Sequence, residues 1–286
     1  MPFFNILLLS LFTLAIYSCS PGEQEEGLEQ AGKILENPTK RLVLSSDIDW
    51  EQLNPARGDQ SPQAGTVWGD RKGEVATGFL AKFVDGFSSP PHIHNVTYRA
   101  IVIKGLIHND DPAAADMWMP SGSFWTQPVG EAHITSAKGE ENIAYVEIDR
   151  GPYLVQPIED AFDSGERPVN IDAINIIWLG ADKTNWVSSD SEAEISFLWE
   201  SSNQKGLRGL FVKLPAGHRG QLSSEGAIFH AIVIQGELDY QMAGETTTLD
   251  PSSYFGVEGA ATHQLANEAE EAVIIYVRTN GKIGLS

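Results

Sequence analysis

The chain has 286 residues, of which 39 are acidic and 19 are Lys or Arg, so its formal net charge is −20. This length allows two domains, and a hydrophobic content of 42% is ordinary for globular cores. The charge argues against nucleic acid and anionic lipid as electrostatic partners, because binding phosphate requires clustered Lys and Arg. Acidity at this level mainly supports solubility.

The first residues predict a processing signal rather than a folded element. Residues 3–17 form an apolar run that is too short to span a bilayer comfortably. The run ends in the sequence Ile-Tyr-Ser-Cys at 16–19, which resembles the lipobox of bacterial lipoproteins, although no Lys or Arg precedes it. The resemblance implies that residues 1–18 are a lipoprotein signal peptide and that Cys19 carries the lipid. An ordinary cleaved signal and a retained anchor are the alternatives.

Cys19 is the only cysteine, which rules out an intrachain disulfide and a thiolate metal ligand. Lipid on this residue would hold the protein on a membrane, since each buried methylene contributes about 0.8 kcal/mol. Residues 19–40 are rich in Glu, Gln and Gly and predict a flexible tether. We therefore expect a lipid-anchored protein of the bacterial cell envelope, on the periplasmic side or the outer membrane. Its only contact with the membrane would be the N-terminal lipid.

From residue 41 onward, short runs of β-branched and aromatic residues alternate with Gly, Pro, Asn and Asp. This pattern predicts an all-β protein, and no segment indicates a helix of three turns. The clearest expected strands are residues 77–84, 100–103, 117–119 and 143–148. Many short strands at this spacing favour a sandwich or a barrel.

The body of the chain repeats itself at an offset of 131 residues. This shift places Trp68 on Trp199, and it lays residues 100–105 over residues 231–236 with five of six identical. A single offset that holds over about fifty residues without gaps indicates a duplicated domain.

Three histidines are the candidate metal ligands. In a strand, His92 and His94 would lie on the same face about 6.6 Å apart, where both can reach one ion. A third ligand must then come from another strand, and His133 is the candidate. The alternative for the first two is a pair of solvated loop histidines after the Pro90-Pro91 turn.

The spacing of these residues resembles the two cupin motifs. The first motif is Gly86, five residues, His92-x-His94, three residues, Tyr98, six residues and Gly105. The second is Gly122, five residues, Pro128-x-Gly130, two residues and His133. Within the cupins, residues 90–99 and the aromatic residues after them look like an uncharacterised bacterial bicupin family. That family is related to the ChrR-type cupins and more distantly to acetylacetone-cleaving dioxygenases.

The resemblance implies two tandem jelly-roll barrels of six to eight strands each. We expect lobe 1 at residues 41–155, a connector at 156–169 and lobe 2 at 170–286. In lobe 1, Tyr98 replaces the Glu ligand that cupins often have, and Ala137 replaces a frequent Asn. The remaining three imidazoles are neutral and suit one divalent ion of iron, zinc, manganese or nickel.

The aromatic residues around this site each allow two roles. Tyr98 could donate a hydrogen bond to a bound water, enolate or peroxide as a catalytic residue, or it could only line the barrel and exclude water. Trp118, Phe124 and Trp125 are expected in the core or pocket wall rather than as groups that stack on a substrate.

The second copy lacks the three-histidine pattern. At the same offset Ser223 falls on His92, Glu225 on His94 and Phe229 on Tyr98. Glu225, His263 and His218 could still form a weak second-lobe site, and the favoured alternative is a degenerate lobe that supports lobe 1 by packing. His230 should point away from the barrel interior, because its neighbour Phe229 faces inward.

Two functions follow from this interpretation. The first is a metalloenzyme that acts on a small oxygenated molecule, with oxygen-dependent cleavage of a diketone-like compound favoured over hydrolysis or isomerisation. The second is a non-catalytic ligand- or metal-binding sensor in the envelope. A structural partner in an envelope complex and a homodimer stay open. An open coordination position beside a substrate-sized cavity would favour the enzyme.

Overall fold

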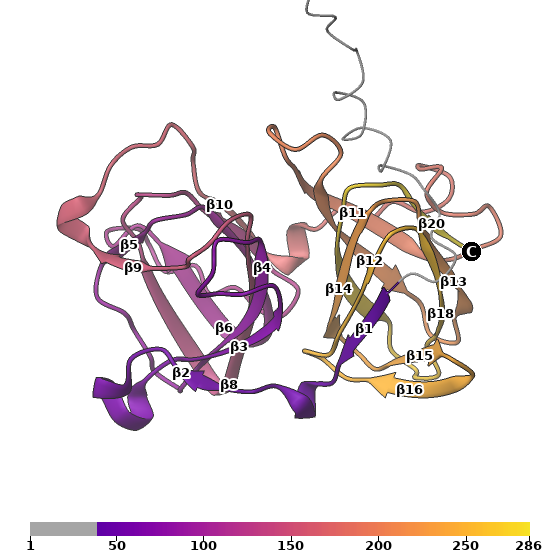
Figure 1. The fold of residues 1–286 in the computed structure, drawn as a ribbon, viewed down its shortest axis with the longest axis horizontal. Helices are drawn as coiled ribbons and strands as arrows, with labels where there is room; N and C mark the ends of the chain where they lie inside the picture. Colours follow the sequence, from indigo (N-terminus) through magenta and orange to yellow (C-terminus); the bar gives the residue numbers. More distant parts are fainter. Residues whose placement is uncertain (1–38) are drawn as a thin grey trace, which may run out of the picture.

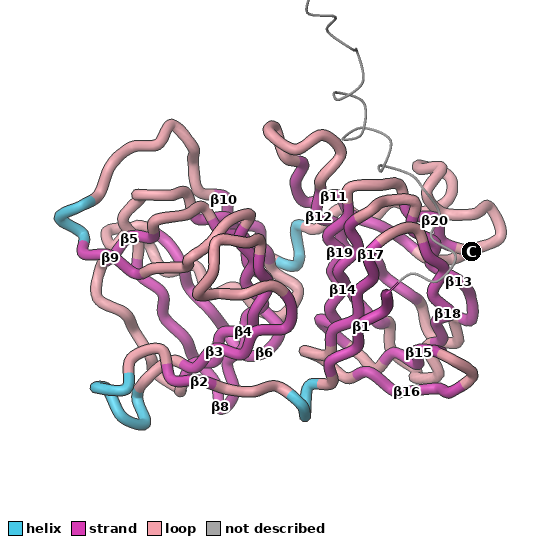
Figure 2. The backbone as a smooth tube through the Cα atoms, in the orientation of Figure 1, coloured by secondary structure: helices cyan, strands magenta, loops and turns pink. Residues whose placement is uncertain are grey.

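The computed structural model describes residues 39–286, which form two β-rich lobes side by side (Figure 1). Strands and loops dominate, and the helical segments in this part are short 3-10 helices at Ser45–Asp47, Pro55–Gln60, Ile158–Asp160 and Ala173–Asn175 (Figure 2). No helix within residues 39–286 is long and apolar enough to cross a membrane. The expected signal peptide, the lipid-carrying Cys19 and nearly all of the tether lie outside the described residues.

The first lobe is built on a seven-stranded antiparallel sheet of order β10-β7-β6-β8-β4-β3-β2. Its strands are β2 (Glu51–Gln52), β3 (Gln63–Trp68), β4 (Thr77–Phe83), β6 (Tyr98–Asp110), β7 (Phe124–Gln127), β8 (Ile134–Ile148) and β10 (Val169–Ile171). A separate two-stranded sheet joins β5 (His92–His94) to β9 (Val155–Pro157).

Three of the four expected strands lie in β4, β6 and β8. The expected strand at 117–119 is wrong: Met119 makes a single bridge to Ile107, and its neighbours stay irregular.

The long strands β6 and β8 bend and so form two walls of the barrel. Their pairing shifts register on both sides of Lys104. Gly105 lies at this bend with φ +76°, and a Cβ there would collide with the side chain of Asn142, so only glycine fits. Beyond the bend, the far end of β6 pairs with the start of β8, and isolated bridges join this wall to residues 88 and 92. The bend therefore positions β5 against the start of β8.

The second lobe consists of two antiparallel sheets around a closed apolar core. The six-stranded sheet has the order β1-β17-β14-β19-β12-β11, and its strands are β1 (Thr39–Val43), β11 (Glu194–Glu200), β12 (Arg208–Leu214), β14 (Ile228–Gln235), β17 (Tyr254–Glu258) and β19 (Val273–Thr279). The five-stranded sheet has the order β16-β15-β18-β13-β20, and its strands are β13 (Arg219–Ser224), β15 (Leu238–Met242), β16 (Glu245–Leu249), β18 (Ala261–Ala266) and β20 (Ile283–Leu285). Both lobes are jelly-roll barrels, as expected.

The two lobes exchange edge strands. β1 pairs with β17 of the second lobe, although the chain then enters the first lobe. β10 pairs with β7 of the first lobe just before the chain enters the second. The expected lobe boundaries at residues 41 and 170 fall inside these two exchanged strands.

The sheets of the two lobes pack face to face, and their contacts repeat the internal duplication. Trp68 donates to the hydroxyl of Tyr145 at 2.9 Å, and Trp199 donates to Tyr276 at the same distance. Each pair follows the 131-residue offset. His230 stacks on Trp68 with ring centroids 3.9 Å apart, so it points into this interface and away from its own barrel, as expected.

A buried ion pair lies at the centre of this interface. Glu147 and Arg278 are related by the 131-residue offset, and Arg278 Nη1 lies 3.1 Å from Glu147 Oε1. Their side chains are 0% and 2% exposed. Arg278 Nη2 also lies 2.7 Å from Asp149, whose pKa falls because Arg99 and Arg278 outweigh its burial.

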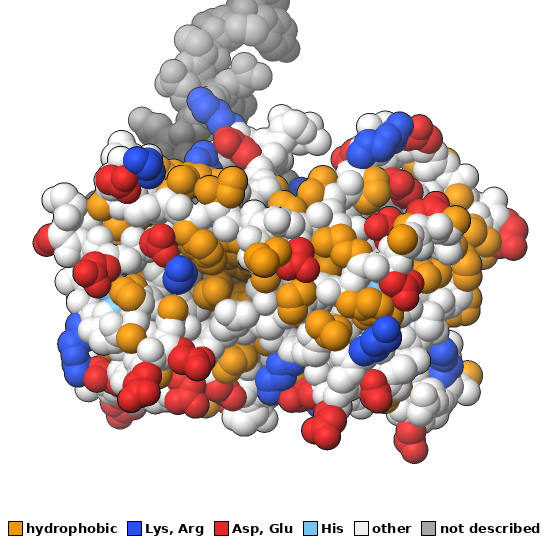
Figure 3. Space-filling view, turned by 180° about the vertical axis from the view of Figure 1, so that it is seen from behind, with side chains coloured by type: hydrophobic (Ala, Val, Ile, Leu, Met, Phe, Trp, Pro, Cys, Tyr) orange, Lys and Arg blue, Asp and Glu red, His pale blue; other side chains and the backbone are white. Residues whose placement is uncertain are grey.

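On the outer surface, Figure 3 shows acidic side chains mainly around a central band of hydrophobic ones.

Candidate metal centre

The backbone brings the second motif onto the first. His92 and His133 exchange two backbone hydrogen bonds of 3.0 Å each, which places their side chains on the same face. His94, two residues along β5, shares that face. The amide of Gly130 donates to the carbonyl of His94 at 3.0 Å and fixes the turn that leads to His133. These backbone hydrogen bonds therefore hold all three histidines against one point of the barrel interior.

The three imidazoles converge there. One ring nitrogen from each of His92, His94 and His133 lies within 4.8 Å of the other two, and no other such group of three or more occurs between residues 39 and 286. His94 and His133 are buried, and His92 is partly exposed. The structure thus brings together the three residues that the motifs predict.

Backbone carbonyls orient all three rings. Each Nδ1 lies beside a carbonyl oxygen, at 2.9 Å from Pro90 for His92, 3.0 Å from Leu154 for His94 and 3.1 Å from Glu131 for His133. Because a carbonyl only accepts, each Nδ1 carries the proton and each Nε2 presents a lone pair. Metal-binding histidines commonly donate one ring N–H to a carbonyl in this way, which fixes the tautomer and the direction of the other nitrogen.

Burial keeps these imidazoles neutral. Desolvation lowers the pKa of His133 to about 3, and the nearby His92 adds to the effect. Desolvation likewise holds the pKa of His94 well below its ordinary value, with further contributions from His133 and His92. Burial also lowers the pKa of His92. Neutral imidazoles with convergent lone pairs fit a divalent cation, and the set contains no carboxylate that would reduce its charge.

Tyr98 lies beside the histidines, but its proton is held elsewhere. Its oxygen is 3.4 Å from His133 Nε2, while its hydroxyl donates to Asn109 Oδ1 at 2.9 Å. Asn109 donates to Gln127, and Gln127 donates to the same Glu131 carbonyl that accepts from His133. Burial raises the pKa of Tyr98 well above its ordinary value, so the hydroxyl stays protonated. This network ties Tyr98 to the orientation of the His133 ring.

A second tyrosine, Tyr153, reaches the site although the sequence motifs do not indicate it. Its hydroxyl lies 3.1 Å from His94 Nε2, and its ring stacks on His94 with centroids 4.4 Å apart. Burial raises its pKa well above the ordinary value. Asn95 clamps this segment by donating to the Pro152 carbonyl at 2.9 Å and accepting from the Leu154 amide at 2.8 Å. The only sequence signal was a tyrosine after a Gly-Pro pair.

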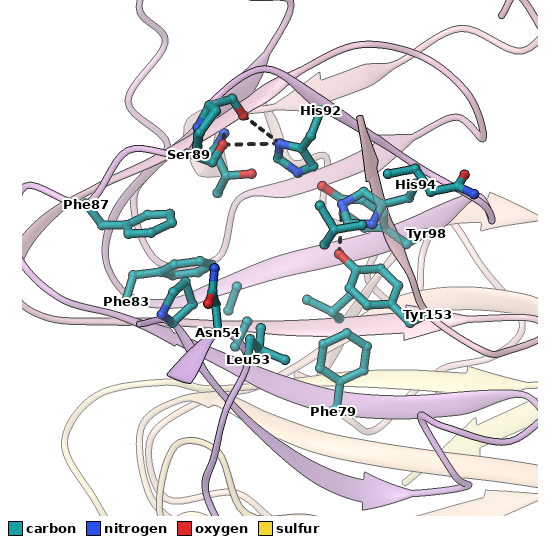
Figure 4. A pocket seen from close by; sticks show the side chains of 18 of the residues that line it. Leu53, Asn54, Phe79, Phe83, Phe87, Ser89, His92, His94, Tyr98 and Tyr153 are labelled. Carbon is teal, nitrogen blue, oxygen red and sulfur yellow. Dashed lines mark hydrogen bonds between the residues drawn. The ribbon is translucent and has the colours of Figure 1, made fainter. Parts of the chain in front are cut away.

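A cavity of about 470 Å³ opens beside the histidines. In Figure 4 His92, His94 and Tyr153 lie at one end, and Phe83 and Phe87 lie at the other. Its lining is mostly apolar, and among the lining residues that the structure describes, Arg57 is the only permanently charged one. The guanidinium of Arg57 lies 5.1 Å from the centre of the Phe87 ring. The site is therefore open to a molecule of substrate size.

The aromatic residues singled out in the sequence separate into three places. Trp125 lines the cavity and donates to the Tyr98 oxygen at 3.5 Å. Phe124 belongs to the apolar cluster between the lobes. Trp118 packs under Lys138, whose ammonium lies 3.6 Å from the ring centre, and it is not among the cavity-lining residues.

The structure does not bring the second-lobe candidates together. Glu225 is exposed, whereas His263 is fully buried and bonded through Nδ1 to the Tyr240 hydroxyl at 3.0 Å. His218 is not part of any metal-binding group in the described chain.

Strand register explains the missing second site. The bridge between His92 and His133 corresponds to the pair Leu222 and His263, so Leu222 takes the place of His92. The 131-residue offset places Ser223 on His92, one residue away from the structural equivalent. A difference of one residue assigns each side chain to the opposite face of the strand.

Comparison with solved structures supports the cupin fold. A candidate dioxygenase of Nostoc punctiforme superposes with a TM-score of 0.64 at 14% identity, covering 84% of this chain and 82% of that one. Salicylate 1,2-dioxygenase of Pseudoaminobacter salicylatoxidans, solved with gentisate, gives 0.56 at 13% identity, covering 87% and 85%. Oxalate decarboxylase of Lactobacillus farciminis, solved with formate, gives 0.56 at 11% identity, covering 89% and 90%.

At these identities the likeness concerns the fold alone. No curated protein matches the sequence. A family model described as "Domain of unknown function (DUF4437)" matches residues 41–285. The match covers both barrels, and the chain therefore belongs to the DUF4437 family.

Proposed function

We propose that the protein is a metal-dependent enzyme whose first lobe acts on a small, oxygenated and largely apolar molecule. One observation carries this proposal: ring nitrogens of His92, His94 and His133 converge within 4.8 Å of one another, and two of these residues, His92 and His94, line a cavity of about 470 Å³. A structural metal site would be closed by its protein ligands, whereas a catalytic site keeps a position open beside a pocket.

The roles follow from the geometry. His92, His94 and His133 would hold one divalent ion of iron, zinc, manganese or nickel. When bound, such an ion supplies a Lewis acid for an oxygen donor, and iron also supplies redox chemistry. The apolar wall around Phe79 and Phe83 excludes water and receives the carbon skeleton of the substrate.

Among reaction types, we favour oxygen-dependent cleavage of a carbon–carbon bond in a diketone-like compound. The resemblance to acetylacetone-cleaving dioxygenases supports this choice, and so does the shared fold with a salicylate 1,2-dioxygenase. Hydrolysis and isomerisation are the rivals. The lipobox-like sequence ending at Cys19 supports a lipid-anchored location in the cell envelope, where the substrate would be met.

The test combines metal analysis with oxygen consumption. Protein purified without added metal should contain about one equivalent of a divalent metal, and a His92→Ala variant should contain much less. Protein loaded with Fe(II) should consume oxygen when β-diketones such as acetylacetone are added. Metal in the wild type without turnover of any tested compound would favour the sensor function. The absence of metal in both proteins, and after incubation with Fe(II) or Zn(II), would refute the proposal.

A further inference from the structure

The hydroxyl of Tyr153 lies next to the candidate metal position, where it would contact a molecule bound to the ion. It lies 3.1 Å from His94 Nε2, the atom whose lone pair faces the other two imidazoles. His94 Nδ1 already donates to the Leu154 carbonyl, so Nε2 can only accept, and the Tyr153 hydroxyl must be the donor. A metal ion on Nε2 would take this acceptor and release the Tyr153 proton for another partner.

The two site tyrosines differ in where their protons go. The Tyr98 hydroxyl donates to Asn109 Oδ1 at 2.9 Å, an acceptor that a metal ion would leave in place. The Thr135 hydroxyl donates to the same oxygen at 2.7 Å and helps to hold it. In the described chain, the Tyr153 hydroxyl has no acceptor other than His94 Nε2. Metal loading therefore frees the proton of Tyr153 and not that of Tyr98.

We propose that Tyr153, rather than Tyr98, is the residue that donates a hydrogen bond to the molecule held beside the metal. The proposal rests on the proposed function, since it requires an ion on the three histidines. It assigns to Tyr153 the role that the motif suggested for Tyr98, and it leaves Tyr98 as a positioning residue for the His133 side of the site.

The surroundings of Tyr153 hold its hydroxyl at the site after it loses its acceptor. Asn95 binds the backbone on both sides of Tyr153. The backbone amide of Tyr153 itself donates to the Arg71 carbonyl at 3.2 Å. Its ring lies between His94 and Phe79, with centroids 4.4 Å and 5.1 Å away. These contacts do not depend on the hydroxyl, so replacing tyrosine with phenylalanine removes the donor and keeps the packing.

The experiment measures metal and anion binding rather than turnover. Wild-type protein and three variants, Tyr153→Phe, Tyr98→Phe and Tyr240→Phe, are loaded with Co(II), and azide is titrated while the visible spectrum is recorded. Tyr240 is the matched control, because its hydroxyl bonds to an imidazole at 3.0 Å in the second barrel, away from the metal site. Circular dichroism and Co(II) stoichiometry establish that each variant is folded and loaded.

Tyr153→Phe should weaken azide binding about three- to tenfold, the usual effect of losing one hydrogen bond. It should also bind Co(II) about two- to fivefold more tightly, because no hydroxyl competes for His94 Nε2. Tyr240→Phe should change azide binding less than twofold, and Tyr98→Phe should weaken it less than Tyr153→Phe does. Equal azide affinity in Tyr153→Phe and wild type would overturn the inference, and so would a loss confined to Tyr98→Phe. If wild-type protein takes up no Co(II), the proposed function fails first.

Discussion

Removing one partner of the buried Glu147–Arg278 pair should cost far more stability than removing a surface pair, and the two partners should not cost the same. Arg278→Met would leave the Glu147 carboxylate, which is fully buried, without a cation and with only the Tyr145 and Tyr276 hydroxyls as donors. Stranding a buried charge in this way costs about 3–5 kcal/mol of unfolding free energy.

Glu147→Gln should cost less, about 2 kcal/mol, because Arg278 keeps its 2.7 Å contact with Asp149. The double variant should cost at least about 1 kcal/mol less than the sum of the single ones, since the two side chains are in contact. For a protein of this size, the loss in Arg278→Met corresponds to a fall in Tm of about 10 °C.

Guanidinium chloride unfolding at constant m-value is the assay. The solvent-facing pair Lys213–Glu194 supplies the control: it has a similar contact of 2.7 Å, but its side chains are 32% and 33% exposed. Glu194→Gln should therefore cost less than about 1 kcal/mol. Strictly additive costs for Glu147→Gln and Arg278→Met would refute the reasoning, and so would a larger cost for Glu147→Gln than for Arg278→Met.

Three further outcomes can be checked. Because burial lowers the pKa of His94 and brings that of His133 to about 3, protons should not displace the metal at mildly acidic pH. Co(II) affinity should change little between pH 7.5 and 6.0, whereas three histidines with an ordinary pKa near 6.5 would lose on the order of fiftyfold. In fluorescence titrations, Arg57→Gln should weaken the binding of 2-naphthoate about three- to tenfold and leave the binding of 2-naphthol unchanged. Equal losses of affinity for both compounds would show that the charge of Arg57 is irrelevant. Gly78→Ala should lower the unfolding free energy by more than about 2 kcal/mol, since its Cβ would strike the indole of Trp68, and near-wild-type stability would contradict this close contact.

The metal ligands could be predicted from sequence because the spacing around His92, His94 and His133 carries both motifs. The two-residue period of a strand and the turn at Gly130 are enough to place these side chains on one face. Tyr153 could not be predicted in the same way. It lies in an irregular segment after β8, and its position depends on Asn95 far away in the chain.

The sequence pattern also could not predict how strands from distant segments pair. A shift of one residue in the second copy put Ser223 and Glu225 in the places that Leu222 and Ser224 occupy. Hydrophobic alternation is weak there, so the alignment could not choose the register. The offset that identified the duplication did contain one unused signal: it maps Glu147 onto Arg278, opposite charges at equivalent positions of two packed sheets.

The exchange of β1 and β10 means that neither barrel can be cut out of the chain intact. A fragment of residues 41–155 would lack β10 and bare the hydrogen-bonding edge of β7, and a fragment of residues 170–286 would bare β17 in the same way. Naked sheet edges recruit strands from other molecules, so such fragments would aggregate rather than fold as independent modules. The second lobe, which lacks the three-histidine cluster, is thus not dispensable: the lobe that carries His92, His94 and His133 cannot be expressed or engineered without it.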